Sequence, residues 1–193
     1  MKKSILSVFF LFVLSGFIFC EENLFSFSFG LSSGSVFYDS VEMLNQTKGI
    51  REYDDYKRLL LGASTSINYN PIKEASFYIG AESFFDIYWT DQYNANYISL
   101  DFPFGIKIYP NIGGLNLGLA YLFGIRFDNV DFEEYYYSES TAWGNGFKIN
   151  IEYNFAHDLD FSILPAIGCY WKCIPRGRGN YDNQIGAYVA LCF

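Results

Sequence analysis

Apolar and polar residues alternate one by one along most of the chain beyond residue 24. In the clearest run, Leu115 to Phe127, every odd position is apolar and most even positions are small or polar. Alternation of period two is typical of a β-strand whose two faces meet different surroundings. Similar runs cover residues 25–32, 59–69, 77–89, 98–108, 115–127, 143–155, 159–172 and 185–193. The pattern therefore predicts an all-β chain of about eight strands.

The connections between these runs alternate in length. Short stretches rich in turn formers occupy residues 70–73, 110–114 and 156–158, and longer polar stretches occupy 33–57, 90–96, 129–142 and 173–182. Gly, Pro, Asn and Asp favour tight turns between strands. The alternation predicts an antiparallel up-and-down meander, with both termini on the side of the short turns.

The first twenty residues have a different character. Lys2 and Lys3 precede an almost wholly apolar stretch over 5–19, and Cys20 is followed by two glutamates. This order predicts a secretory signal peptide over residues 1–20 and one domain over 21–193. One alternative is an N-terminal membrane anchor, although the stretch is shorter than the ~20 residues that a span needs. Another is a lipid-modified Cys20, although Phe19 is bulky where that motif has a small residue.

The content of the polar face separates two kinds of barrel. A soluble barrel turns this face to water, whereas a membrane barrel turns it to the interior and exposes the apolar face to lipid. The face is rich in Gly, Ser, Ala and Asn, which favours an antiparallel transmembrane β-barrel. Its few charges are mixed in sign, and we expect them to form ion-pair layers that fill a narrow lumen; a narrow polar path is the alternative. These residues are Arg58, Glu82, Asp86, Asp101, Lys107, Arg126, Lys148, Glu152, Asp160 and Lys172.

Aromatic residues stand at both ends of the apolar face. Trp89, Trp143 and Trp171 lie at the long-loop ends of the runs. Tyr69, Tyr153 and Phe155 lie at the short-turn ends. Aromatic girdles at both rims of an apolar band are typical of barrels that span the outer membrane.

The last run ends on an aromatic residue preceded by alternating apolar ones: Ile185, Ala187, Val189, Leu191 and Phe193. This resembles the C-terminal signature that the barrel assembly machinery reads in bacterial outer-membrane proteins. With the meander and the girdles, the chain resembles the small eight-stranded outer-membrane family of OmpA-, OmpX- and OmpW-like barrels over nearly its whole mature length. The resemblance implies a bacterial outer-membrane location among outer-membrane lipids, periplasmic termini and exposed long loops.

Composition narrows the possible chemistry. Aromatics make up 21% of the 193 residues and charged residues only 18%, with a net charge of −8. An acidic chain without a basic cluster is not expected to bind nucleic acid. No catalytic motif is present, and His157, the only histidine, falls in a short turn. We therefore expect no enzyme activity, no cofactor and no metal site. Cys169 and Cys173 form a disulfide only if the strand bends.

The long loops hold the other candidate site. Two arginines, Arg176 and Arg178, make the last loop the only basic one, suited to anionic surface glycans or to the acidic loops. An acidic, tyrosine-rich rim consists of Asp131, Glu133, Glu134, Tyr135, Tyr136 and Tyr137. This rim either engages a host protein or divalent cations, or is a solvated variable loop. The function expected is a filled barrel that serves as an envelope platform and displays these loops. The alternative is a narrow passive channel for small or apolar solutes.

Overall fold

A computed structural model describes residues 24–39, 47–110, 112–132, 135–155, 163–177 and 181–193. The expected signal peptide lies outside these residues. The strands of the described part are β1 (Phe25–Tyr38), β2 (Lys57–Ile72), β3 (Ala75–Trp89), β4 (Tyr93–Ile108), β5 (Leu115–Phe132), β6 (Tyr135–Ser140), β7 (Gly144–Asn154), β8 (Leu164–Pro175) and β9 (Tyr181–Cys192).

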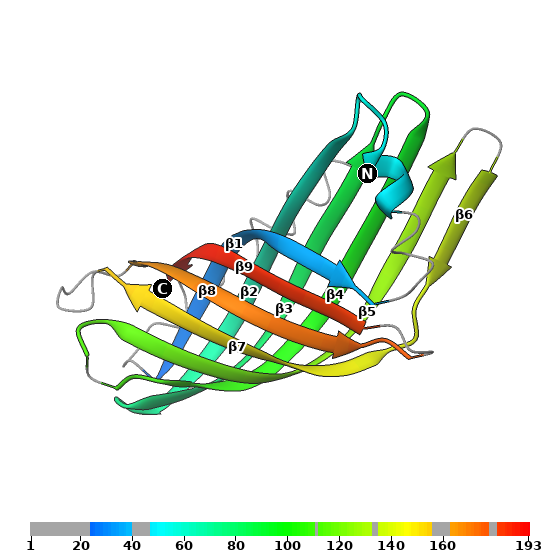
Figure 1. Cartoon of the computed structure of the whole chain (residues 1–193). Coiled ribbons are helices and arrows are strands. Elements are labelled where there is room, and N and C mark those ends of the chain that lie inside the picture. Colours follow the sequence, from blue (N-terminus) through cyan, green and yellow to red (C-terminus); the bar gives the residue numbers. More distant parts are fainter. Residues whose placement is uncertain (1–23, 40–46, 111, 133–134, 156–162, 178–180) are drawn as a thin grey trace, which may run out of the picture.

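The strands close into an antiparallel barrel (Figure 1). Each barrel strand pairs with its neighbours in the chain, and β1 pairs with β9 to complete the ring. β6 pairs only with β5 and stands outside the ring, so eight of the described strands form the wall. The predicted eight-stranded up-and-down barrel is confirmed.

The predicted alternation fixes which side chains face out. In β5, Leu122 is fully buried whereas its neighbour Tyr121 is 54% exposed on the outer surface. The exposed set along the wall is almost entirely large and apolar, while charged and small residues turn inward. The distribution of apolar and polar side chains is thus the reverse of that in a soluble protein, as a lipid environment requires.

The strands β2 to β6 extend further along the barrel axis than the alternation predicts, and this longer part is called the tall side. β1 and β2 pair only up to Ser32 and Gly62, beyond which β2 to β6 continue as an open sheet (Figure 1). Residues expected to form a loop over 129–142 instead form the β5–β6 hairpin, and the loop expected over 90–96 is a tight turn at 90–92. Backbone pairing continues here because ladder hydrogen bonds do not depend on which side chains the strands carry.

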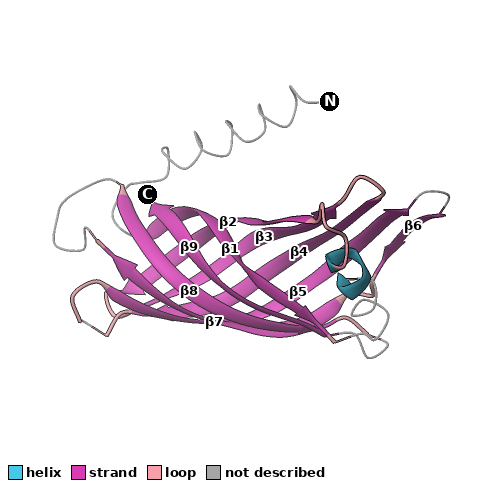
Figure 2. Cartoon of the chain, turned by 45° about the horizontal axis from the view of Figure 1, so that its top comes forward, coloured by secondary structure: helices cyan, strands magenta, loops and turns pink. Residues whose placement is uncertain are grey.

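The inner face of this extension has a small apolar core of its own. A helical turn over residues 47–51 lies against it (Figure 2). Ile50 is almost fully buried among the rings of Tyr38, Tyr88 and Tyr97 and the side chain of Val130. Residues 47–51 of the first long loop therefore pack over the tall side of the barrel. In the described residues we find no helix with the length and hydrophobicity needed to cross a membrane.

The C-terminal residue, Phe193, pairs with β1 at the opposite end of the barrel. The backbone N–H and carbonyl of Phe193 pair with those of Phe27 at 2.8 and 3.0 Å, and the two rings are 6.3 Å apart. In Figure 2 the C-terminus lies at the far end of the barrel from the β5–β6 hairpin. The last residue is therefore part of the wall.

Candidate functional site

A continuous chain of opposite charges runs through the lumen. Arg126 donates from Nε to Asp128 at 2.6 Å and from Nη1 to Asp182. The other oxygen of Asp182 accepts from Nε of Arg176 at 2.7 Å. The Nη2 group of Arg176 in turn donates to Asp101 at 3.0 Å. Asp182 thus lies between two arginines that are distant in the sequence.

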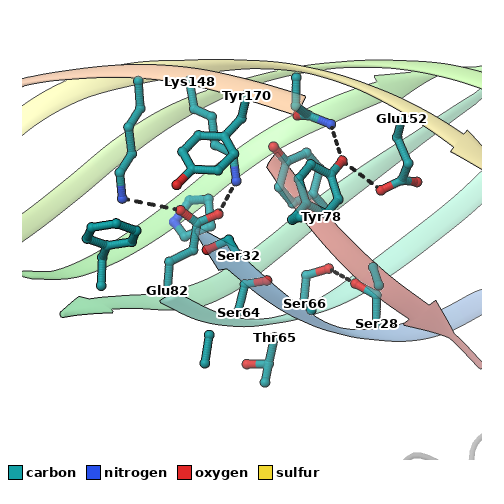
Figure 3. A pocket seen from close by; sticks show the side chains of 18 of the residues that line it. Ser28, Ser32, Ser64, Thr65, Ser66, Tyr78, Glu82, Lys148, Glu152 and Tyr170 are labelled. Carbon is teal, nitrogen blue, oxygen red and sulfur yellow. Dashed lines mark hydrogen bonds and ion pairs between the residues drawn. The ribbon is translucent and has the colours of Figure 1, made fainter. Parts of the chain in front are cut away.

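The chain continues toward the middle of the barrel. Lys172 donates to Asp101 at 2.8 Å and lies 3.7 Å from Glu82. Glu82 also pairs with Lys148, whose ammonium lies 5.1 Å from the ring of Tyr170. Figure 3 shows Glu82 and Lys148 meeting across the interior. Glu82 and Lys148 are 66 residues apart in the sequence, so only barrel closure brings them together.

Two further ion pairs lie beside this chain. Nearer the tall side, Arg58 donates two hydrogen bonds of 2.8 Å to Asp86. The hydroxyls of Tyr38 and Tyr88 donate to the same carboxylate. Such forked, charge-assisted contacts are among the stronger hydrogen bonds in proteins.

Toward the C-terminal end, Lys107 lies 3.4 Å from Glu152. The amide of Asn116 and the hydroxyl of Tyr188 also donate to Glu152, at 3.1 and 2.8 Å. Acids and bases in these pairs are equal in number within the described lumen. The bases are Arg58, Lys107, Arg126, Lys148, Lys172 and Arg176, and the acids are Glu82, Asp86, Asp101, Asp128, Glu152 and Asp182.

Between the Glu82 and Glu152 layers lies a polar cavity of about 60 Å³ (Figure 3). Its β1–β2 side carries serine hydroxyls, among which Ser28 and Ser66 hydrogen-bond at 2.6 Å. A cavity of this size holds a few water molecules at most. The interior is therefore largely filled by side chains.

Every predicted lumen residue that the structure describes takes part in these ion pairs; Asp160 lies outside the described residues. Sequence reasoning missed Asp128 and Asp182. Asp182 continues the inward positions of the last strand (Gly186, Tyr188) at spacing two, so extending the alternation would have found it.

The expectation for Arg176 was wrong. It was placed in the exposed last loop, but its side chain is 2% exposed and lies between Asp101 and Asp182. β8 extends to Pro175, and two inward carboxylates compensate the desolvation of the guanidinium. The basic loop is thereby reduced to Arg178, which lies outside the described residues.

The acidic rim is partly described. Asp131 and Tyr136 are exposed, Tyr136 by 70%, whereas Tyr137 packs against the apolar core of the extension and donates to Glu139. Tyr135 begins β6. Glu133 and Glu134 lie outside the described residues.

The predicted girdle residues all project from the outer surface. Trp143 stacks on Phe123 at 4.6 Å, and Trp171 meets Phe147 edge-on at 5.1 Å. Trp89 is exposed at the end of β3. At the other rim, Tyr69 packs on Phe25 and Tyr153 on Phe155. The residues Ile185, Ala187, Val189 and Leu191 face outward along β9.

No cluster of three or more possible metal ligands occurs among the described residues. Cys169, Cys173 and Cys192 are free thiols, so Cys169 and Cys173 do not pair here. His157 lies outside the described residues.

Neither a protein-family model nor a curated protein matches the sequence. Solved structures do match. The attachment invasion locus protein Ail of Yersinia pestis superposes with a TM-score of 0.60 at 9% identity, over 88% of this chain and 97% of Ail. The fold is that of the small eight-stranded outer-membrane barrels. At this identity the likeness shows the fold alone, and the apolar outer band, which suits a bilayer, supports the outer membrane as its location.

A second structure of Ail, in complex with the heparin analogue sucrose octasulfate, superposes with a TM-score of 0.55 at 10% identity, over 88% of this chain and 97% of Ail. The resemblance predicted from the sequence is thus confirmed at the level of fold.

Proposed function

We propose that the protein is a closed, non-enzymatic outer-membrane barrel that displays the β5–β6 hairpin above the membrane as a surface for protein contact. The observation that carries this proposal is the lumen network, in which every described charge has a partner of opposite sign. The interior supplies rigidity, and the tall side of the wall supplies the exposed surface.

A closed lumen follows from the cost of separating these pairs. A passing ion must displace Lys148 from Glu82 and Lys172 from Asp101, and removing one partner of a buried pair costs roughly 3–5 kcal/mol. Phe84 and Lys172 line the polar cavity of about 60 Å³ and also a second, smaller cavity of about 10 Å³, so they stand between the two. An eight-stranded barrel leaves an interior that side chains just fill.

The chemistry of the exposed hairpin indicates the kind of partner. Asp131 and Glu139 are exposed acids, and Tyr136 offers a flat ring with a polar tip. Arg176 lies in the lumen and is not available to the rim. The exposed bases of the described rim, Lys48, Arg51 and Lys57, are outnumbered by exposed acids, which disfavours a sulfated glycan such as the heparin analogue bound to Ail. These acids include Glu52, Asp54, Asp91, Asp131 and Glu139. A neutral or basic protein segment fits this rim better than an anionic glycan.

Conductance in planar bilayers tests the closed lumen. We expect no discrete channel steps from the wild-type barrel, and we expect steps from a Glu82→Ala, Lys148→Ala double variant, which removes the central pair. A Ser64→Ala variant, altering a cavity serine without removing a charge, serves as the control. Steps in the wild type at the level of the double variant would overturn the closed-barrel proposal.

Binding to host cells tests the display role. Bacteria expressing the protein are compared with bacteria whose barrel carries a two-residue turn in place of 129–139. We expect the trimmed barrel to fold, as judged by heat-modifiable gel mobility, and to lose adhesion that free heparin does not inhibit. Equal adhesion by both, or full inhibition by heparin, would contradict the proposed surface.

The alternative is a narrow passive channel for small or apolar solutes. The polar cavity of about 60 Å³ favours it, since this cavity is a polar space inside the lumen that is large enough for water. The same bilayer measurement decides between the two, because a channel conducts without any substitution.

A further inference from the structure

In the described part of the lumen network, one buried donor has no partner. Arg176 is almost fully buried, its Nε donates to Asp182 and its Nη2 to Asp101. Its Nη1, equally buried, has no hydrogen-bond partner among the described residues. A buried donor without an acceptor costs about 1–3 kcal/mol, and more when it is charged. An acceptor from outside the chain would remove that cost.

A cavity of about 10 Å³ lies beside this guanidinium. Among the described residues, its charged lining consists of Arg126, Lys172, Arg176 and Asp182. The other carboxylates that pair with these cations, Asp101 and Asp128, lie outside the lining. Ser99 contributes a largely buried hydroxyl, and Tyr38, Tyr97 and Gln184 complete the polar lining. The volume is about that needed for one water-sized particle.

We propose that this cavity binds a single small monovalent anion, with chloride as the physiological occupant. The unpartnered Nη1 offers an anion a charge-assisted hydrogen bond. Arg126, Lys172 and Arg176 are all ion-paired, but two of their partners, Asp101 and Asp128, do not line the cavity, so its described wall is more cationic than anionic. Sulfate and phosphate are too large for the volume. The closed lumen does not depend on this site, since the ion pairs of Arg176 to Asp101 and Asp182 are complete without it.

Bromide identifies the occupant directly. The full mature chain is refolded in detergent with sodium bromide in place of chloride, crystallised, and measured at the bromine absorption edge. We expect one anomalous peak in the lumen, within hydrogen-bond distance of Arg176 Nη1. Density at that point without an anomalous signal would mean a water molecule and would overturn the proposal.

Two variants test the ligands. Arg176→Lys removes the Nη1 donor, and Ser99→Ala removes a lining hydroxyl; Ser64→Ala, in the larger cavity, is the matched control. We expect no bromide peak in the first, a weaker peak in the second and an unchanged peak in the control. Equal peaks in the wild type and Ser99→Ala would overturn the assignment, even if Arg176→Lys fails to fold.

Halide-dependent stability gives a measure in solution. The unfolding temperature in micelles is recorded over increasing chloride, with gluconate holding the ionic strength constant. A ligand that binds only the folded state raises this temperature with concentration. We expect such a rise for the wild type and Ser64→Ala and a smaller one for Ser99→Ala. The same rise in all three would show general salt screening and contradict a specific site.

Discussion

Asp101 is the residue whose neutralisation should cost the barrel most stability. Its carboxylate is fully buried and accepts from Lys172 at 2.8 Å and from Arg176 at 3.0 Å. Opposite it on β5 stands Gly124, where a Cβ atom would come within 2.1 Å of the carboxylate oxygen. The wall thus has a gap in its side chains at the place that this carboxylate fills.

The substitution Asp101→Asn keeps the shape and removes the charge. Lys172 then retains only Glu82, at 3.7 Å, and Arg176 retains only Asp182. Breaking a buried pair from one side costs roughly 3–5 kcal/mol, because the remaining charge stays desolvated. Since each cation keeps one carboxylate, we expect the free energy of unfolding to fall by about 3 kcal/mol, the lower bound of this range.

The assay is urea unfolding of the barrel in lipid vesicles, followed by tryptophan fluorescence and by heat-modifiable gel mobility. Asp131→Asn, which removes the same charge at an exposed site, is the control, with a change within about 0.5 kcal/mol. Adding Lys172→Met to Asp101→Asn should restore part of the loss, since it removes a cation left short of a partner. A loss for Asp101→Asn no larger than that of the control would refute the reasoning, because it would mean that water screens the lumen.

Two other substitutions and one deletion test the wall. Trp143→Ala removes the stack on Phe123 and should cost about 0.5–1.5 kcal/mol beyond lost area in the same unfolding assay, whereas the exposed Tyr136→Ala should cost almost nothing. Gly146→Val should destabilise by about 1–3 kcal/mol, because a Cβ there meets the Cys173 carbonyl at 2.0 Å; Gly49→Val, with open space around it, should be near neutral. Deleting Phe193 removes two hydrogen bonds to Phe27 and should lower the yield of heat-modifiable barrel in cells, with Phe193→Tyr close to wild type.

The sequence determined the strands and their two faces. A wall strand between lipid and lumen must alternate, so residues such as Leu119 and Tyr121 could be assigned outward and Arg126 inward without a structure. The same physics identified the girdle tryptophans and the interior position of charges such as Glu82 and Lys148. The apolar alternation does not show how far the strands continue beyond the membrane band. The sequence therefore predicts a loop where the β5–β6 hairpin lies and a longer connection than the turn at 90–92.

Tertiary structure decided which charges meet. Lys148 pairs with Glu82 and Arg176 with Asp101 across 66 and 75 residues of sequence, and neither spacing contains any local signal. Closure of the barrel sets these contacts, because the stagger between strands fixes the height at which each inward side chain enters the lumen. Closure also places Arg176 in the lumen, although the sequence predicts it in an exposed loop. A guanidinium is buried only where carboxylates compensate its lost hydration, and Asp101 and Asp182 do so here. The alternation specified that charges would lie inside, and the geometry of closure specified their partners.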